Sequence, residues 1–177
     1  MYYARIPYAI SNNNIKLRRL RFSDIPFLDE GLKHQGISLS HKLNKIEFFS
    51  WLYVWWWITK TFTLIYCIES NSIRIGFIGF YNLNLGKSAE LTLVIFKTEN
   101  RRHGYGSRAF GLLARYLKDH HIINKIIVRI ETDNVISLAF WQKLGFRKVS
   151  ISHDIATMHI DLNNYSLDSM NRLLHLP

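Results

Sequence analysis

Cysteine, proline and acidic residues are scarce in this chain of 177 residues. It has one cysteine, three prolines, and 13 aspartates and glutamates against 23 lysines and arginines, for a formal net charge of +10. A single cysteine excludes an internal disulfide, and with no signal-peptide pattern at the N-terminus we expect a reducing, cytoplasmic location. The shortage of acid argues against a strongly cationic substrate such as a polyamine, which would favour an acidic cleft.

The chain has no apolar run as long as a membrane-spanning helix. Residues 51–68 come nearest, but Thr59-Lys60-Thr61 divide them, and neither part approaches the ~20 apolar residues that a span needs. Repeats, low-complexity tracts and linkers are absent too, and a hydrophobic content of 48% argues against disorder. We therefore expect a single domain over residues 1–177 and no membrane span.

The excess of basic residues raises the question of nucleic acid. The densest group, Arg18-Arg19 with Arg21, alternates with apolar residues as in a strand. Because nucleic-acid-binding surfaces gather their basic residues on one face, this scatter favours a solvated surface and a pocket for an anionic ligand. The histidines show no metal-ligand spacing, so no metal is expected.

The most informative segment is Arg101-Arg102-His103-Gly104-Tyr105-Gly106-Ser107, between a β-rich run and a helical run. A strand that turns into a helix through two glycines leaves backbone N–H groups unpaired at the positive end of the helix dipole. Such groups bind phosphate, and glycine allows its close approach. Ala109 replaces the third glycine of a dinucleotide motif, and the lysine of a P-loop is missing. We interpret the turn as a pyrophosphate site; the alternative is a tight turn with a solvated basic rim.

A second motif follows further along the chain. Asp133 or Asn134 is the natural N-cap of a short helix that Gly145 would end. Together the two motifs resemble the signatures of the GNAT superfamily of acyl-CoA-dependent N-acyltransferases, in its ribosomal-protein N-terminal and spermidine acetyltransferase-like branch. The first signature is Arg101-x-x-Gly104-x-Gly106, and the second is Asn134, Trp141, Lys143, Gly145 and Phe146.

The resemblance implies a mixed α/β (α+β) fold with a strongly twisted, mostly antiparallel sheet of about six to seven strands and about four helices. Sequence periodicity agrees with this order of elements. It predicts strands at 15–22, 62–69, 73–81, 88–96, 125–131, 147–152 and 157–162. It predicts helices from Ile25, over 44–58, from the glycine turn to about His120, at 134–144 and from Ser166, with a flexible connection at 31–40.

The family's coenzyme contacts can be carried over to this sequence. The resemblance implies acetyl-CoA as co-substrate, with its pantetheine arm paired to the strand end at Val94, Ile95 and Phe96. The turn would hold the pyrophosphate, and Arg101, Arg102 or Arg108 would reach the 3′-phosphate. The remaining expected coenzyme contacts are His103, Gly104, Tyr105, Gly106, Ser107, Asn134 and Lys143.

Glu90 and Trp141 are the expected catalytic residues. Apolar residues at 89, 91, 93 and 95 place Glu90 on the opposite face of its strand, where relatives carry a glutamate that takes the proton of the amine. The alternative is a solvated strand glutamate. Trp141 stands where the family usually has a tyrosine that protonates the thiolate, but an indole N–H only donates a hydrogen bond.

We therefore expect a cytoplasmic N-acetyltransferase that moves an acetyl group from acetyl-CoA to a primary amine by direct attack. The acceptor is a small molecule, an amino sugar or a protein N-terminus, and a homodimer is an open alternative to a monomer. The competing hypotheses are a catalytically weak CoA-binding regulatory protein and, with less support, a basic nucleic-acid-binding module. The aromatic block at 51–57 is expected to lie mostly in the core, with one or two rings lining the acceptor pocket.

Overall fold

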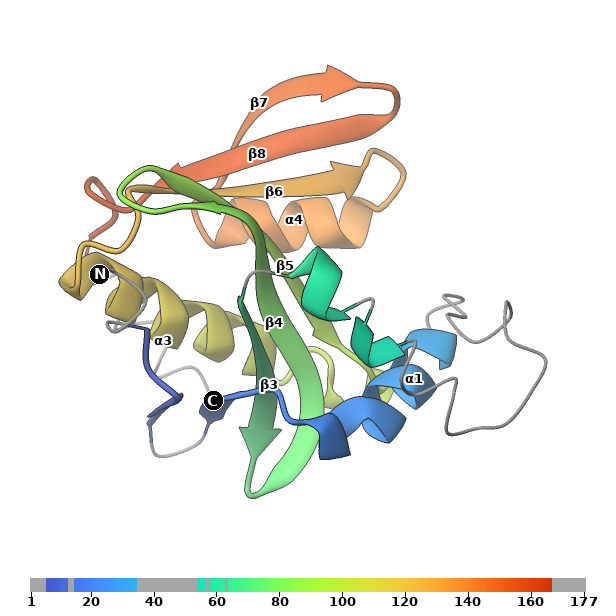
Figure 1. Ribbon diagram of the computed structural model, residues 1–177. Helices are drawn as coiled ribbons and strands as arrows, with labels where there is room; N and C mark the ends of the chain where they lie inside the picture. Colours follow the sequence, from blue (N-terminus) through green and yellow to red (C-terminus); the bar gives the residue numbers. More distant parts are fainter. Residues whose placement is uncertain (1–5, 13–14, 35–53, 57, 63, 167–177) are drawn as a thin grey trace.

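A computed structural model describes residues 6–12, 15–34, 54–56, 58–62 and 64–166. Within this part of the chain, eight strands form one sheet in the order β1-β2-β3-β4-β5-β6-β8-β7, and every neighbouring pair is antiparallel except β5 and β6 (Figure 1). The strands are β1 (Ala9–Ser11), β2 (Lys16–Arg19), β3 (Leu64–Ser70), β4 (Ile73–Asn84), β5 (Ser88–Ile95), β6 (Lys125–Glu131), β7 (Arg147–Ser152) and β8 (Ile155–Asp161). The helices are α1 (Ile25–His34), α3 (Tyr105–Asp119) and α4 (Val135–Lys143), and residues 54–56 and 58–61 are also helical.

The predicted mixed fold is confirmed, with two corrections. Strand β1 was missed because three residues are too short to show a period of two. Residues 31–34 belong to α1 rather than to a connection. Gly31 serves there for close packing, since a Cβ on it would lie 2.3 Å from the ring of Phe96. The helix expected over 44–58 falls mainly, and the one from Ser166 almost wholly, outside the described residues.

The two faces of the sheet carry different layers. Helices α3 and α4 pack on one face, where residues such as Phe110, Leu113 and Trp141 join the larger hydrophobic cluster. On the other face, α1 and the helical residues 54–56 and 58–61 pack on β3 to β5 through Leu28, Ile58 and their neighbours. No helix of the described residues is long and apolar enough to cross a membrane.

A buried charge network fixes the N-terminal part of the sheet. The Arg18 guanidinium donates to both oxygens of Asp24, at 2.6 and 2.8 Å, and its Nε donates to Glu69 at 2.7 Å. Arg74 also donates to Asp24, at 3.3 Å. Burial acts to raise the pKa of Asp24, but the hydrogen bonds from Arg18 and from the Arg21 amide prevail and hold that pKa below its ordinary value.

Strands β5 and β6 form a fork. Their parallel pairing joins residues 88–90 to residues 125–127 and ends at the pair Glu90 and Ile127. Beyond this pair the two strands diverge, as Figure 1 shows, so the rest of β5 has a neighbour, β4, on one edge only. The open edge of β5 leads to the glycine turn at the start of α3.

Candidate functional site

The open edge of β5 presents the backbone groups of alternate residues. The amide of Phe96 donates to Ile75 on β4, and a Cβ on Gly76 of β4 would lie 2.0 Å from the carbonyl oxygen of Val94. Backbone groups alternate in direction along a strand, so those of Val94 and the amide of Phe96 point to β4, and those of Leu93 and Ile95 point to the fork. The predicted contact through Ile95 agrees with this geometry, whereas those through the backbone of Val94 and the amide of Phe96 do not. Leu93 was missed because period two alone does not say which edge pairs.

The glycine turn exposes the first amides of α3. Gly104 is the N-cap residue in the left-handed conformation, with φ of 71°, and the first printed bond of the helix runs from the amide of Arg108 to the carbonyl of Gly104. The amides of Tyr105, Gly106 and Ser107 precede that bond and have no acceptor within the helix. They lie at the positive end of the helix dipole, which suits an anion.

Three arginines surround this turn, and the structure assigns them different roles. Arg101 is turned back onto β5, where it donates to the carbonyls of Ile95 at 3.0 Å and Phe96 at 3.1 Å. Arg108 is buried and donates to the carbonyl of His103 at 2.9 Å, so it braces the turn from inside. Arg102 is exposed. Of the three residues expected to reach a 3′-phosphate, Arg108 is buried, Arg101 is exposed but bonded to carbonyls of the chain, and Arg102 is exposed.

Gly106 marks the point where α3, α4 and β5 meet. A Cβ on Gly106 would lie 3.3 Å from both the Leu93 side chain and the ring of Phe140. The second glycine of the motif is therefore required by packing between the helices and the strand. It lets the first turn of α3 reach the open edge of β5.

Glu90 lies at the base of the fork, on the face opposite α3 and α4. Only 11% of its side chain is exposed. Its Oε2 lies 3.0 Å from Nε of Arg129, and its Oε1 accepts from Nη2 of Arg129 at 3.2 Å and from Nδ2 of Asn82 at 3.0 Å. Asn82 has a φ of 50° and lies where the register of β4 shifts, which aims its amide at Glu90. The face predicted for Glu90 is confirmed, but the alternative of a solvated side chain is not.

Tyr81 is the neighbour of Glu90 across β4 and β5, so both side chains share one face. Burial raises the pKa of the Tyr81 phenol, and the Glu90 carboxylate raises it further, while Arg129 opposes the shift. The phenol therefore stays protonated, as a hydrogen-bond donor beside Glu90. Tyr81, Asn82 and Arg129 were all missed, because nothing in the sequence shows that they meet at one carboxylate.

The second signature contributes mainly structure. The side chain of Asn134 accepts from the amide of Ser137 at 3.1 Å, which confirms it as the N-cap of α4, and Lys143 is exposed at the end of that helix. Trp141 is 5% exposed and makes edge contacts with Phe110 and Phe146. Its indole lies in the core, and the predicted catalytic role of Trp141 has no support in this position.

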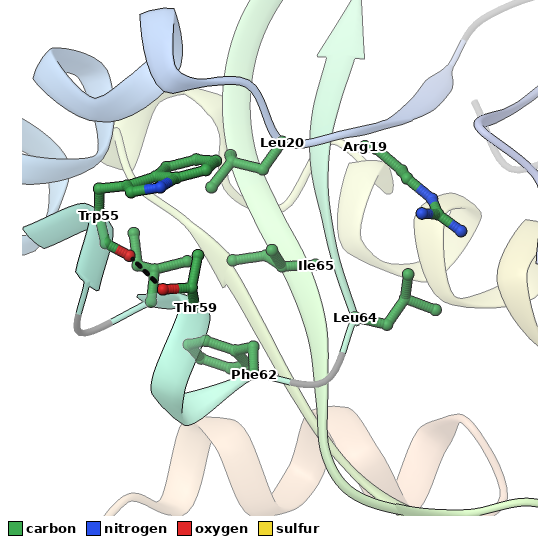
Figure 2. A pocket seen from close by; sticks show the side chains of 8 residues that line it. Arg19, Leu20, Trp55, Thr59, Phe62, Leu64 and Ile65 are labelled. Atoms are coloured by element: carbon green, nitrogen blue, oxygen red, sulfur yellow. Dashed lines mark hydrogen bonds between the residues drawn. The ribbon is translucent and has the colours of Figure 1, made fainter. Parts of the chain in front are cut away.

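A hollow away from the fork lies between β2, β3 and residues 55–62 (Figure 2). Trp55, Ile58 and Phe62 line it, and the Thr59 hydroxyl donates to the Trp55 carbonyl at 3.0 Å. Arg19 at its rim points away from these rings in Figure 2. Phe62 also contacts Tyr81, so one aromatic residue of this segment reaches the neighbourhood of Glu90. No group of three or more His, Cys, Asp or Glu side chains gathers at a metal-like site within the described residues.

This chain is similar to known proteins in sequence and in fold. The sequence model of the Acetyltransferase (GNAT) domain matches residues 14–147. The chain therefore belongs to the GNAT acetyltransferase family, as the two signatures predicted.

Solved structures agree in fold at low sequence identity. RimJ of Mycobacterium smegmatis in complex with CoA-disulfide has a TM-score of 0.75 and 16% identity, over 96% of this chain and 95% of that one. RimL, a ribosomal L7/L12 alpha-N-protein acetyltransferase in complex with coenzyme A, has a TM-score of 0.70 and 14% identity, over 86% of this chain and 97% of that one. Spermidine N-acetyltransferase from Vibrio cholerae, in complex with CoA and spermine, has a TM-score of 0.69 and 17% identity, over 87% of this chain and 99% of that one.

One curated relative is similar over part of its length. The N-acetyltransferase 9-like protein of Nematostella vectensis is 31% identical over 80 residues. The match covers 44% of this chain and 40% of that protein.

Proposed function

We propose that this protein transfers an acetyl group from acetyl-CoA to a primary amine. The observation that carries the proposal is the fork: an open β5 edge leads from a buried carboxylate, Glu90, to the unpaired amides at the start of α3. A thioester arm in the fork would lie between a phosphate site at one end and a base at the other. The family membership of the chain supports this use of the fork.

In the proposed complex, the amides of residues 105–107 hold the pyrophosphate. The backbone groups of Leu93 and the amide of Ile95 pair with the pantetheine arm as an added strand would, beside the Ile95 carbonyl that accepts from Arg101. The exposed Arg102 is the candidate for the 3′-phosphate, while Arg101 and Arg108 hold the turn in shape. Lys143 stays a candidate for a coenzyme contact from the end of α4.

The proposed reaction is a direct attack. The amine nitrogen forms a bond to the thioester carbonyl carbon, and the carbon–sulfur bond breaks. Glu90 takes the proton that the nitrogen loses, directly or through a water molecule. The thiolate leaves and takes a proton from water, since Trp141 is buried and an indole does not supply one.

Thiol release from acetyl-CoA in the presence of a panel of amines tests the proposal. Glu90→Gln keeps the size of the side chain and removes its basicity, so turnover should fall by roughly 10²-fold with little change in acetyl-CoA affinity. Glu99→Gln is the matched control, because Glu99 is a surface glutamate with a side chain 74% exposed, and it should leave turnover unchanged.

The results separate the proposal from a regulatory role. Binding of acetyl-CoA without thiol release for any amine would support a CoA-binding protein that lacks activity. If Glu90→Gln keeps the turnover of the wild-type protein, the protein is an acetyltransferase in which Glu90 is not the base.

A further inference from the structure

Arg129 is an exposed member of the group around Glu90. Its side chain is 57% exposed, whereas that of Glu90 is 11% exposed. It holds Glu90 with Nε and with one hydrogen of Nη2, at 3.0 and 3.2 Å. A guanidinium has five N–H donors, so three remain on its outer edges. Glu90 is the only acceptor of its hydrogen bonds among the residues that the structure describes.

Arg129 also lies at the mouth of the fork. The last paired residue of β6 is Ile127, and Arg129 follows two residues later on the same face, where β6 has left β5. Its side chain reaches back to Glu90, on the face of the sheet opposite α3 and α4. An amine that reaches Glu90 from this face therefore has its other substituents beside the outer edge of Arg129.

The nearby positive charges share this face. Residues directly opposite each other on neighbouring strands lie on one side of a sheet. Ile127 on β6 is opposite His159 on β8, which is opposite Arg147 on β7. His159 is partly exposed and Arg147 is exposed.

The acidic residues on this face lie on either side of Arg129. Asp161 is opposite Lys125, at the closed end of the fork. Glu131 follows Arg129 by two residues on the same face, at the last position of β6. Arg129 is the charged side chain that contacts Glu90, so an anionic group beside Glu90 meets Arg129 first.

We infer that Arg129 binds an anionic group, a carboxylate or a phosphate, that the acceptor carries close to its amine. In this arrangement Glu90 receives the amine, and the outer edge of the Arg129 guanidinium pairs with the anion in a charge-assisted contact. Arg129 would then select the acceptor as well as position Glu90. The inference rests on the proposed acetyl transfer, and it names the class of acceptor.

Two pairs of acceptors, each differing in one anionic group, test the inference. The first pair consists of the dipeptides Ser-Asp and Ser-Asn, each with an amidated C-terminus. The second pair consists of glucosamine 6-phosphate and glucosamine. Wild-type protein should prefer the anionic member of at least one pair by about tenfold or more in kcat/KM, the effect of one hydrogen bond to a charged group. The pair that shows the preference identifies carboxylate or phosphate.

Variants assign the preference to Arg129. Arg129→Gln should reduce it to less than about threefold, mainly through a higher KM for the anionic acceptor, and Arg129→Lys should retain part of it. The ratio within a pair cancels any effect on the basicity of Glu90, which acts on both members equally. Arg115→Gln removes the same charge from an exposed arginine on α3 and should leave the ratio unchanged.

Binding gives a second measurement that needs no turnover. Calorimetry on the protein saturated with CoA should show the anionic member of the preferred pair binding at least about tenfold tighter, and Arg129→Gln should abolish the difference. Equal affinity and equal kcat/KM within both pairs would overturn the inference. Acetyl transfer to neutral amines would still be measurable in that case. A failure of the inference about Arg129 is therefore distinguishable from a failure of the proposed acetyl transfer.

Discussion

The face of the sheet opposite α3 and α4 is covered in its first half and bare in its second. Over β3 to β5 it packs against α1 and residues 54–56 and 58–61, and β3 is mostly buried along its whole length. Over β6, β8 and β7 nothing within the described residues covers it: β6 and β8 bury alternate residues only, and β7 is exposed throughout. Glu90 and Arg129 meet across the border between the two halves.

This difference separates the tasks of the two halves. In the covered half Arg18 is paired with both Asp24 and Glu69. At the border a buried carboxylate is paired with a half-exposed arginine, so part of the charged group remains available to a ligand. Stability should therefore depend most on the covered half, and chemistry on the border.

The largest effect is expected for Asp24→Asn in the covered half. The change leaves the buried Arg18 without its main counterion and should lower the free energy of unfolding by about 3–5 kcal/mol, as measured by denaturant unfolding. Because the pKa of Asp24 is lowered by folding, its contribution is present above the unfolded pKa near ~3.9 and is lost as the pH falls through the folded value. The exposed Asp133→Asn is the control, and an equal effect of both would contradict the role of the network.

A pair of isoleucine substitutions compares the first and second halves of the sheet on its other face, the face of α3 and α4, where Ile68 joins the larger hydrophobic cluster and Ile151 is opposite Ala156 of β8. Ile68 on β3 is fully buried, whereas Ile151 on β7 is 56% exposed. Ile68→Ala should lower the free energy of unfolding by about 2–5 kcal/mol, and Ile151→Ala by less than about 0.5 kcal/mol. Thermal or denaturant unfolding measures both. A large effect of Ile151→Ala would mean that β7 is covered in solution, for example by a second copy of the chain.

Gly104→Val tests the phosphate site at the end of the open edge. We expect a loss of at least ~2 kcal/mol of acetyl-CoA binding, from lost donors and a clash, measured by calorimetry. Gly86→Val is the matched control, because Gly86 also has a positive φ, of 73°, and nothing lies within 4 Å of its Cβ position. It should bring the same backbone strain and leave the affinity unchanged. Unchanged affinity in a folded Gly104→Val variant would place the coenzyme elsewhere.

The smallest effect is expected for Trp141→Phe. Because the indole packs against Phe110 and Phe146, the change should lower the free energy of unfolding by about 1–2 kcal/mol and alter turnover by less than about threefold. Unfolding and steady-state kinetics on the same sample measure the two effects. A large loss of turnover at unchanged stability would place the indole in the reaction and restore the role predicted from the sequence.

Much of the fold could be predicted because its signals are local. Period two placed β3 to β6 within a few residues of their observed ends, and Asn134 and Gly145 marked the limits of α4. The glycine turn was predicted for the same reason, since a left-handed residue and a helix start are specified by adjacent residues. The sequence left open which of Arg101, Arg102 and Arg108 reaches a 3′-phosphate, because the direction of a long side chain depends on the carbonyls that the fold brings near it.

By itself, the sequence determined the family, the order of strands and helices, the glycine turn at the start of α3 and the face on which Glu90 lies. These follow from repeat periods and turn residues that act over a few positions. Only the tertiary structure decided that β5 and β6 part at Glu90, that Asn82 and Arg129 hold its carboxylate, and that Trp141 belongs to the core. Glu90 and Arg129 are 39 residues apart, and they meet because a parallel crossover through α3 places their strands side by side.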